Sequence, residues 1–331
     1  MADTTTDWRE LAQRTLAGGR ITRAEALAVL HSGDDELLEV LAAAFEIRRR
    51  HFGRTVNLHV IQNAKSGLCT EDCAFCSQSA VAESGIAQYA LQSADEIAEG
   101  ARWAKARGAL RYCIVASGRG PADAEVDRLC DTVRRIKGET DIQICTSLGL
   151  LTPDQARRLA AAGVDRYNHN LETSERHYPA ICATHSWQDR VRTIGTAREA
   201  GLEICCGGLI GMGESDEDRA DLALSLRNLG ADSIPVNLLD PRAGTPLEGR
   251  LRLTPRDGLR VLAMFRFVNP ATEIRIAGGR EAVLGHLQPL ALYPANSIFT
   301  EGYLTTPGQG WQRDMDLLRD AGFEVGHWVS A

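Results

Sequence analysis

Apolar side chains in the first fifty residues recur at helical spacing, and no alternating run there indicates a strand. Three amphipathic stretches predict helices, at 7–17, 22–30 and 34–51. From Thr55 the pattern changes to short apolar runs that alternate with longer helical ones. We therefore expect a helical extension over residues 1–53 and a larger α/β domain over residues 54–331.

The larger region repeats one unit, a short apolar run followed by a helical stretch. Eight runs predict strands, at 56–62, 110–116, 141–146, 165–170, 203–210, 232–238, 273–277 and 295–300. The stretches that follow them predict helices, at 93–107, 122–137, 153–162, 187–200, 216–228, 254–268, 280–287 and 311–321. Five helix starts carry a capping residue, at Ser93, Thr152, Ser186, Ser215 and Thr254. Eight β-then-α units predict a (β/α)8 TIM-type barrel, or a partly open relative, with its active site at the C-terminal ends of the strands.

Charge and hydropathy exclude two classes of partner. The 331 residues carry a formal net charge of −7, which leaves no basic field for a nucleic acid backbone. No apolar stretch approaches the roughly 20 residues that span a membrane. The N-terminus lacks the basic-then-apolar order of a secretory signal, so we expect a cytoplasmic protein whose nine cysteines are reduced.

Three cysteines stand close together in the loop after the first predicted strand, in the run GLCTEDCAFCSQS. Cys69, Cys73 and Cys76 have C-x3-C-x2-C spacing, and soft thiolates suit an iron–sulfur cluster. Three ligands leave one iron of a [4Fe–4S] cluster open to the amino and carboxylate groups of S-adenosylmethionine (SAM). The run, with Phe75 before its third cysteine, resembles the motif of the radical SAM enzymes, in which Phe75 would lie at the cofactor. The alternative is a structural zinc site, but no fourth cysteine or histidine lies at the spacing that a zinc knuckle needs.

Further cysteines lie in predicted barrel strands: Cys113 in the second, Cys145 in the third, and Cys205 or Cys206 in the fifth. Each alone would be read as a small core residue, the commonest fate of a buried cysteine. Strand residues alternate between inside and outside, so three inward thiols on neighbouring strands could hold a second metal centre.

Arg275 in the seventh strand is a charged group at a predicted interior position. An unpaired buried charge is costly, so the pattern alone favours an ion pair with a carboxylate or with substrate over a metal ligand. Cys130 and Cys182 show no such pattern and are expected to be incidental.

Several runs together resemble biotin synthase from about Val56 to the C-terminal region. They are GLCTEDCAFCSQS, RYC, YNHNLETS, ICCGG leading into GLIGMGE, VNLLDPRAGTPL, IRIAGGRE and ANSIF. The resemblance implies a [2Fe–2S] cluster inside the barrel on Cys113, Cys145, Cys205 and Arg275. The resemblance thus makes Arg275 a cluster ligand, where the pattern alone favoured an ion pair. It also selects Cys205 over Cys206 as the ligand, and we expect Cys206 to be a packing residue.

The resemblance also implies contacts around the substrate and SAM. Asn170 and Glu172 match positions that contact the substrate and the adenosyl ribose, and Asn237 and Asn168 are further candidates for the substrate. The bland alternative for the asparagines is turn chemistry at strand ends. His185 occupies a position where some members have an arginine near the SAM carboxylate, although a lone histidine is more often a surface or capping residue. The segment that begins at Gly208 is expected to bring its backbone close to the adenosyl group.

The function implied is that of a sulfurtransferase acting on dethiobiotin. The outer cluster would cleave SAM, the resulting radical would abstract hydrogen from unactivated carbons, and the inner cluster would supply sulfur. No side chain is assigned as a general acid or base. The resemblance further implies an electron donor such as flavodoxin or ferredoxin and a homodimer. Two alternatives stay open: a related radical SAM enzyme of hydrogenase maturation or the pyrrolysine pathway, and a non-catalytic zinc or iron–sulfur carrier.

Overall fold

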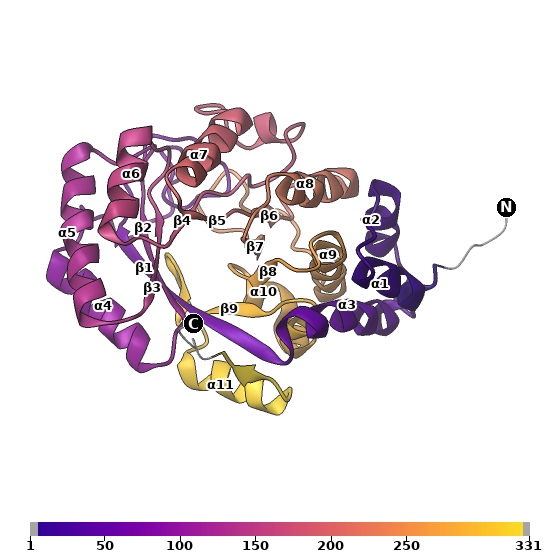
Figure 1. Ribbon diagram of the computed structural model, residues 1–331. Coiled ribbons are helices and arrows are strands. Elements are labelled where there is room, and N and C mark those ends of the chain that lie inside the picture. The colour runs from indigo at the N-terminus through magenta and orange to yellow at the C-terminus, as the bar shows by residue number, and fades with distance from the viewer. Residues whose placement is uncertain (1–5, 327–331) are drawn as a thin grey trace.

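A closed barrel of parallel strands forms the centre of the molecule (Figure 1). The structure is a computed structural model and describes residues 6–326. The barrel strands are β1 (Thr55–Lys65), β2 (Arg111–Ala116), β3 (Gln143–Ser147), β4 (Arg166–Asn168), β5 (Glu203–Cys205), β6 (Gly208–Ile210), β7 (Ser233–Leu238), β8 (Glu273–Ile276) and β9 (Ser297–Thr300). Each strand pairs in parallel with its neighbour, and β1 pairs with β9 to close the ring. The predicted (β/α)8 barrel is confirmed.

The fifth predicted strand, 203–210, is broken into β5 and β6. The break falls at Cys206 and Gly207, where the backbone lies against β7 so closely that a Cβ on Gly207 would overlap the carbonyl oxygen of Pro235. Only glycine permits that approach. At this break the Gly207 N–H donates to Asn170 Oδ1 at 3.1 Å, and this hydrogen bond joins the end of β5 to the loop after β4.

Helices surround the barrel, as the alternating pattern predicts. They are α4 (Ala94–Ala106), α5 (Asp123–Glu139), α6 (Pro153–Ala162), α7 (Trp187–Glu199), α8 (Asp216–Asn228), α9 (Pro255–Val268), α10 (Arg280–Leu284) and α11 (Trp311–Asp320), with short 3-10 turns η1 (Tyr178–Ala180) and η2 (Gly285–Leu292). The five predicted capping side chains each accept a backbone N–H from the first turn, at Ser93, Thr152, Ser186, Ser215 and Thr254. The predicted helix 280–287 instead becomes α10 followed by η2, with Pro289 inside the turn.

The C-terminal region adds three short strands that the apolar pattern did not predict. The pair β10 (Gly302–Tyr303) and β11 (Thr306–Pro307) forms a hairpin after β9, and β12 (Glu324–Val325) pairs in parallel with the start of β1. Two-residue strands carry too little periodicity to be recognised in sequence. The hairpin follows a barrel strand at its C-terminal end, which is where it reaches the site described below.

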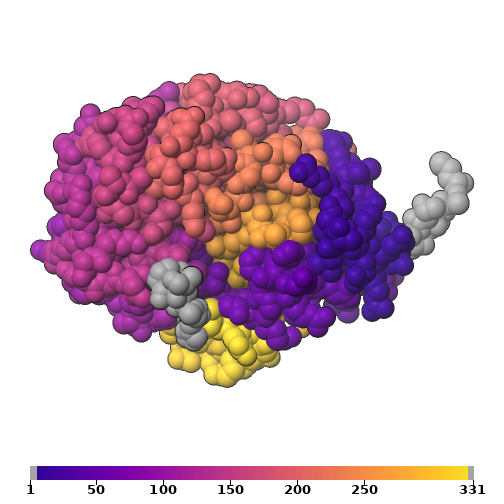
Figure 2. Space-filling model, viewed as in Figure 1, coloured from indigo at the N-terminus to yellow at the C-terminus, as the bar shows by residue number. Residues whose placement is uncertain are grey.

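The N-terminal helices α1 (Trp8–Leu16), α2 (Arg23–Leu30) and α3 (Leu37–Phe52) pack beside α8 and α9 (Figures 1 and 2). They share one continuous apolar core with the barrel. Arg48 of α3 is fully buried and donates to the carbonyls of Thr55 at 2.6 Å and Ala295 at 3.1 Å. The extension is thereby fixed to the starts of β1 and β9. Within residues 6–326, no helix has both the length and the apolarity to cross a membrane.

Candidate active site

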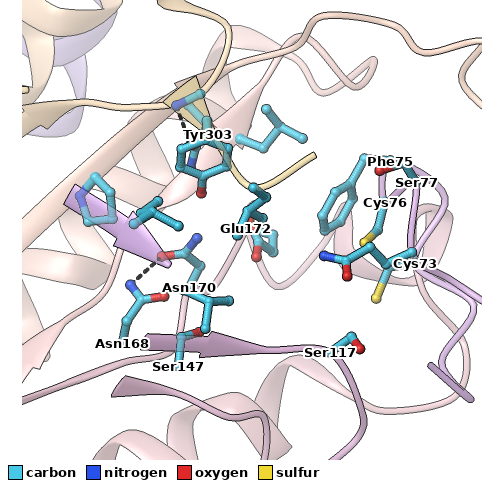
Figure 3. A pocket seen from close by; sticks show the side chains of 18 of the residues that line it. Cys73, Phe75, Cys76, Ser77, Ser117, Ser147, Asn168, Asn170, Glu172 and Tyr303 are labelled. Atoms are coloured by element: carbon cyan, nitrogen blue, oxygen red, sulfur yellow. Dashed lines mark hydrogen bonds between the residues drawn. The ribbon is translucent and has the colours of Figure 1, made fainter. Parts of the chain in front are cut away.

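A cavity of about 320 Å³ opens at the C-terminal ends of the barrel strands. Its wall contains both predicted cysteine groups, Cys69, Cys73 and Cys76 on the loop after β1 and Cys113, Cys145 and Cys205 on β2, β3 and β5. Figure 3 shows Cys73 and Cys76 on one side of this cavity and Asn170, Glu172 and Tyr303 on the other. The barrel rule for active sites thus holds, because strand ends and the loops after them form the wall.

The loop that carries the outer cysteines is docked onto the segment after β4. The Ala74 N–H donates to Ile181 O at 2.9 Å, and the Cys76 N–H donates to Cys73 O at 3.1 Å. Leu68, which precedes the first cysteine, has a left-handed backbone with φ of 54°. Such a conformation costs a residue with a Cβ and persists only where surrounding contacts enforce it. The loop is therefore held in one arrangement by the fold.

The outer thiols fit a metal cluster in their chemistry. Burial raises the pKa of Cys76 to about 11, and a hydrogen bond with Cys182 together with burial raises that of Cys73. At neutral pH these thiols are therefore protonated without a cation, and a coordinated metal would take the place of the protons. Three thiol donors on one loop match three corners of a [4Fe–4S] cluster and leave one iron open.

The inner thiols meet inside the barrel, on β2, β3 and β5, below the outer loop. Cys113 and Cys145 are directly opposite in the β2–β3 register, while β4 lies between β3 and β5. All three side chains are buried. The neighbouring Cys145 thiol lowers the pKa of Cys113, whereas neighbouring thiols and burial raise those of Cys145 and Cys205. Cys206 instead packs in the main apolar core, as alternation along the strand predicts.

Arg275 joins the inner thiols to a buried carboxylate. Its Nη1 lies 3.6 Å from Cys205 Sγ, and its Nη2 lies 2.5 Å from Glu273 Oε1. Burial alone would lower the pKa of Arg275, but Glu273 and the thiols raise it, so the guanidinium stays charged. Among the described residues, its buried Nε has no hydrogen-bond partner. Arg275 thus has the carboxylate partner that the pattern favours. It also contacts Cys205 and has one unsatisfied donor, which fits an inner cluster.

Glu273 is the centre of a charged layer where the strands begin. Its carboxylate lies 3.1 Å from Arg166, 3.7 Å from Arg111 and 3.0 Å from His59 Nε2. Burial would raise the pKa of Glu273, but Arg275, His59 and Arg166 outweigh it and hold the pKa well below its usual value. This layer closes the barrel floor beneath the inner thiols and holds Arg275 in place.

Asn168 and Asn170 extend from the end of β4 toward the cavity. Asn168 Nδ2 lies 3.3 Å from Asn170 Oδ1 and 3.2 Å from Cys205 Sγ (Figure 3). Asn170 Oδ1 also accepts the Gly207 N–H, so its carbonyl end serves the break between β5 and β6. The Asn170 side-chain amide also acts on the Glu172 carboxylate and opposes the rise in its pKa that burial causes, so the two side chains form one polar group in the cavity wall.

Glu172 is held in an uncommon backbone conformation with φ of 68°. Its carboxylate is buried in the cavity wall and lies 3.6 Å from Arg190 Nη1. Burial raises the pKa of Glu172, and Arg190 opposes that rise. A buried acceptor with one cationic neighbour suits recognition of hydroxyl donors.

The Asn237 amide is bound at both ends by backbone. Its Nδ2 donates to Gly208 O at 3.1 Å, and its Oδ1 accepts the Gly278 N–H at 2.8 Å. Asn237 lines the cavity, whereas Leu209 rather than Gly208 contributes to its lining within the described residues. The structure thus brings Asn237 to the cavity wall, whereas Gly208 lies behind Asn237 and contacts its amide.

His185 is buried and does not serve as a surface or capping residue. Its Nδ1 contacts Glu71 Oε2 and lies 3.3 Å from Cys182 Sγ. Cys182 in turn lies 3.8 Å from Cys73 Sγ. Cys182, which was expected to be incidental, lies against the outer loop because the segment after β4 folds back onto it, a contact that the sequence spacing does not reveal. Cys130 is buried in α5, as expected.

Arg190 and Tyr303 are among the cavity-lining residues that the sequence analysis did not identify. Arg190 of α7 donates to Asn170 O at 2.8 Å and to the Tyr178 hydroxyl at 2.6 Å. Tyr303 reaches the cavity from β10 and packs edge-on against Phe299. Arg190 is one of several arginines on an amphipathic helix and has no distinguishing signal. Tyr303 could have been found, because it directly follows a barrel strand.

Comparison with known proteins gives one consistent family. Residues 65–226 match the radical SAM superfamily, and residues 235–324 match the biotin and thiamin synthesis associated domain. A biotin synthase of Salinibacter ruber is 55% identical over 96% of this chain and 89% of its own length. A biotin synthase of Bacillus subtilis strain 168 is 52% identical over 96% of this chain and 95% of its own.

Solved structures agree on the fold alone. Methylornithine synthase aligns with a TM-score of 0.84 at 21% identity, over 96% of this chain and 97% of its own. The FeFe-hydrogenase maturase HydG from Carboxydothermus hydrogenoformans aligns with a TM-score of 0.82 at 17% identity, over 98% of this chain and 80% of its own. Sequence identity therefore separates this chain from those two enzymes, and the chain belongs to the biotin synthase family of the radical SAM superfamily.

Proposed function

We propose that the protein converts dethiobiotin into biotin by inserting sulfur between two unactivated carbons. Cys69, Cys73 and Cys76 would hold a [4Fe–4S] cluster with SAM. A [2Fe–2S] cluster would be held in the barrel by Cys113, Cys145, Cys205 and Arg275. When bound, these groups supply the electron that cleaves SAM and the sulfur atom that is inserted. The observation that supports this pairing is that both thiol groups line one cavity.

The chain's own contribution is orientation and exclusion of water. Asn168, Asn170 and Asn237 all line the cavity and would offer amide groups to the cyclic urea of dethiobiotin, since an amide both donates and accepts. Glu172 offers a buried carboxylate to the ribose hydroxyls of SAM. Phe75 would pack against the cofactor. His185 would lie near the SAM carboxylate, and the backbone near Gly208 would lie close to the adenosyl group.

Proton transfer is not required of the side chains. His169 lines the cavity, but burial lowers its pKa well below the usual value, so it is neutral near pH 7. Apolar wall residues such as Ile61, Leu209 and Phe299 exclude water and stray hydrogen donors from a reactive radical. The site thus suits radical chemistry better than acid–base chemistry.

The proposal extends to partners and organisation. Reduction would come from an external donor such as a flavodoxin or ferredoxin, and the family resemblance supports a homodimer. Nine free cysteines and oxygen-sensitive clusters suit a reducing compartment, so we place the protein in the cytoplasm. We treat residues 1–53 as a helical extension of a 54–331 barrel.

Anaerobic reconstitution with iron and sulfide tests the proposal. We expect about six irons per chain, and biotin by mass spectrometry after addition of SAM, reductant and dethiobiotin. Cys145→Ala should retain about four irons and still cleave SAM, yet form no biotin. Cys130→Ala is the matched control, because this thiol is buried in α5 away from the cavity. SAM cleavage without biotin in the unmodified chain, or full biotin yield from Cys145→Ala, would refute the proposal.

A further inference from the structure

Cys182 and His185 form a compact cluster of ligands with Cys73. One ligand atom from each residue lies within 4.8 Å of the other two. The Sγ atoms of Cys73 and Cys182 are 3.8 Å apart, although the residues are 109 positions apart in sequence. All three residues are buried, with relative exposures of 8%, 6% and 8%. This set differs from the outer cluster site, because it uses only one of the three loop cysteines.

The distances are those of ligands around a single ion. Two thiolates on a tetrahedral zinc, with Zn–S bonds of about 2.3 Å, lie about 3.8 Å apart. The separation of the two sulfurs has this value, whereas the thiolates of a [4Fe–4S] cluster bind different irons and need not meet at one point. Sulfur and imidazole nitrogen are also the donors that zinc prefers in proteins.

His185 has a carboxylate that would orient it as a ligand. Nδ1 contacts Glu71 and lies 3.3 Å from Cys182 Sγ, while Nε2 lies 4.0 Å from the same sulfur. A histidine that donates from one ring nitrogen to a carboxylate and binds metal through the other is the common second-shell arrangement at zinc sites. Asp72 Oδ1 accepts the Ala183 and Thr184 N–H groups and lies 3.2 Å from Cys182 Sγ, so it holds the segment that carries Cys182. The cluster thus offers two sulfurs and one nitrogen and leaves the fourth position of a tetrahedral ion to water.

The surroundings balance the charge of such a site. The two thiolates match the charge of a divalent cation, and the carboxylates of Glu71 and Asp72 lie next to the ligands. Arg119 Nη1 lies 3.4 Å from Glu71, and the guanidinium of Arg190 acts on Cys73. Cations next to the ligands reduce the cost of gathering negative groups in a buried place.

We propose that the chain without its iron–sulfur cluster binds one Zn²⁺ ion through Cys73, Cys182 and His185, with water as the fourth ligand. Since Cys73 would also serve the outer cluster, zinc and that cluster exclude one another; this exclusion rests on the proposed function. Zinc would then keep the loop thiol from oxidation before assembly and would have to leave before the cluster forms.

Zinc titration of the full-length, cluster-free chain tests the site. Under anaerobic reducing conditions and against a chromophoric chelator, we expect about one tightly bound zinc per chain. Cys182→Ser should lose that ion, whereas Cys69→Ser should keep it, because Cys69 belongs only to the outer triad. X-ray absorption at the zinc edge should give two sulfur ligands. Loss of zinc from Cys69→Ser with retention in Cys182→Ser would assign zinc to the triad and overturn the proposal, as would absence of tight binding in the unmodified chain.

A second measurement separates this site from the proposed enzyme activity. Cys182→Ser should still assemble the outer cluster and cleave SAM, and prior zinc should slow assembly in the unmodified chain but not in Cys182→Ser. Equal slowing in both would contradict the shared use of Cys73. Failure of biotin formation with zinc binding intact would count against the proposed function alone.

Discussion

Glu273 and Glu203 contact the same two arginines but differ in burial, which allows a direct test of the charged layer below the inner thiols. Glu273 lies 3.1 Å from Arg166 and 3.7 Å from Arg111, while Glu203 lies 2.7 Å and 3.2 Å from the same pair. The Glu273 side chain is 9% exposed and that of Glu203 is 49% exposed. Replacement of each by glutamine removes one charge at nearly constant shape.

The magnitude follows from burial. Glu273→Gln leaves the guanidinium of Arg275, 2.5 Å away, without its nearest anion in the barrel interior. Removal of one partner from a buried ion pair costs about 3–5 kcal/mol. Glu203→Gln breaks a pair that water screens, and exposed pairs contribute about 0–1 kcal/mol. We therefore expect the two variants to differ by roughly 3 kcal/mol.

Urea unfolding of the cluster-free chain, followed by circular dichroism at pH 7, measures the difference. The midpoint of Glu273→Gln should fall far below that of Glu203→Gln, which should stay near the unmodified chain. Equal midpoints for the two variants would refute the reasoning that Glu273 neutralises the arginines of the barrel floor.

Three further predictions concern other parts of the barrel. Burial lowers the pKa of His59 to about 3 from an ordinary 6.5, so the unfolded chain binds the proton first and the free energy of unfolding falls as the pH drops from 6.5 towards 3. Between pH 7 and 5 the unmodified chain should therefore lose roughly 2 kcal/mol more than His59→Gln in urea unfolding. Equal losses in the two proteins would contradict this. Cys205→Ser should lose about two irons per chain after reconstitution while Cys206→Ser keeps them, and the reverse outcome would exchange their roles. Gly279→Ala should destabilise the chain strongly in thermal unfolding, because the φ of Gly279 is 78° and a Cβ there would overlap a carbonyl oxygen of β7. Gly249 has a similar φ of 74° but open space around it, so Gly249→Ala should cost only about 1–2 kcal/mol. Similar losses in the two variants would show that the overlap at Gly279 is relieved.

The barrel could be predicted from the sequence because each level of pattern agreed with the next. Apolar runs, helical stretches and capping residues such as Thr152 and Ser215 all indicated the same units. The break between β5 and β6 could not be predicted, because it depends on how closely Gly207 approaches β7. The short strands β10 to β12 were too short for a periodic signal.

The site was predictable where residues lie on regular elements. The shared inward side of Cys113, Cys145 and Cys205 on β2, β3 and β5 follows from strand alternation, and so does the outward side of Cys206. Contacts between loops were not predictable. Cys182 meets the outer loop only because the segment after β4 folds back.

Sulfur tracing tests the central claim, that two thiol groups in one cavity serve one sulfur insertion, most directly. The chain would be reconstituted with heavy-isotope sulfide, freed of excess sulfide, and incubated with SAM, reductant, dethiobiotin and ordinary sulfide in solution. The account predicts biotin that carries the heavy isotope, in an amount limited to about one per chain, and no biotin from Cys145→Ala. Biotin that carries only the ordinary isotope would contradict the account, because the sulfur would then come from outside the barrel.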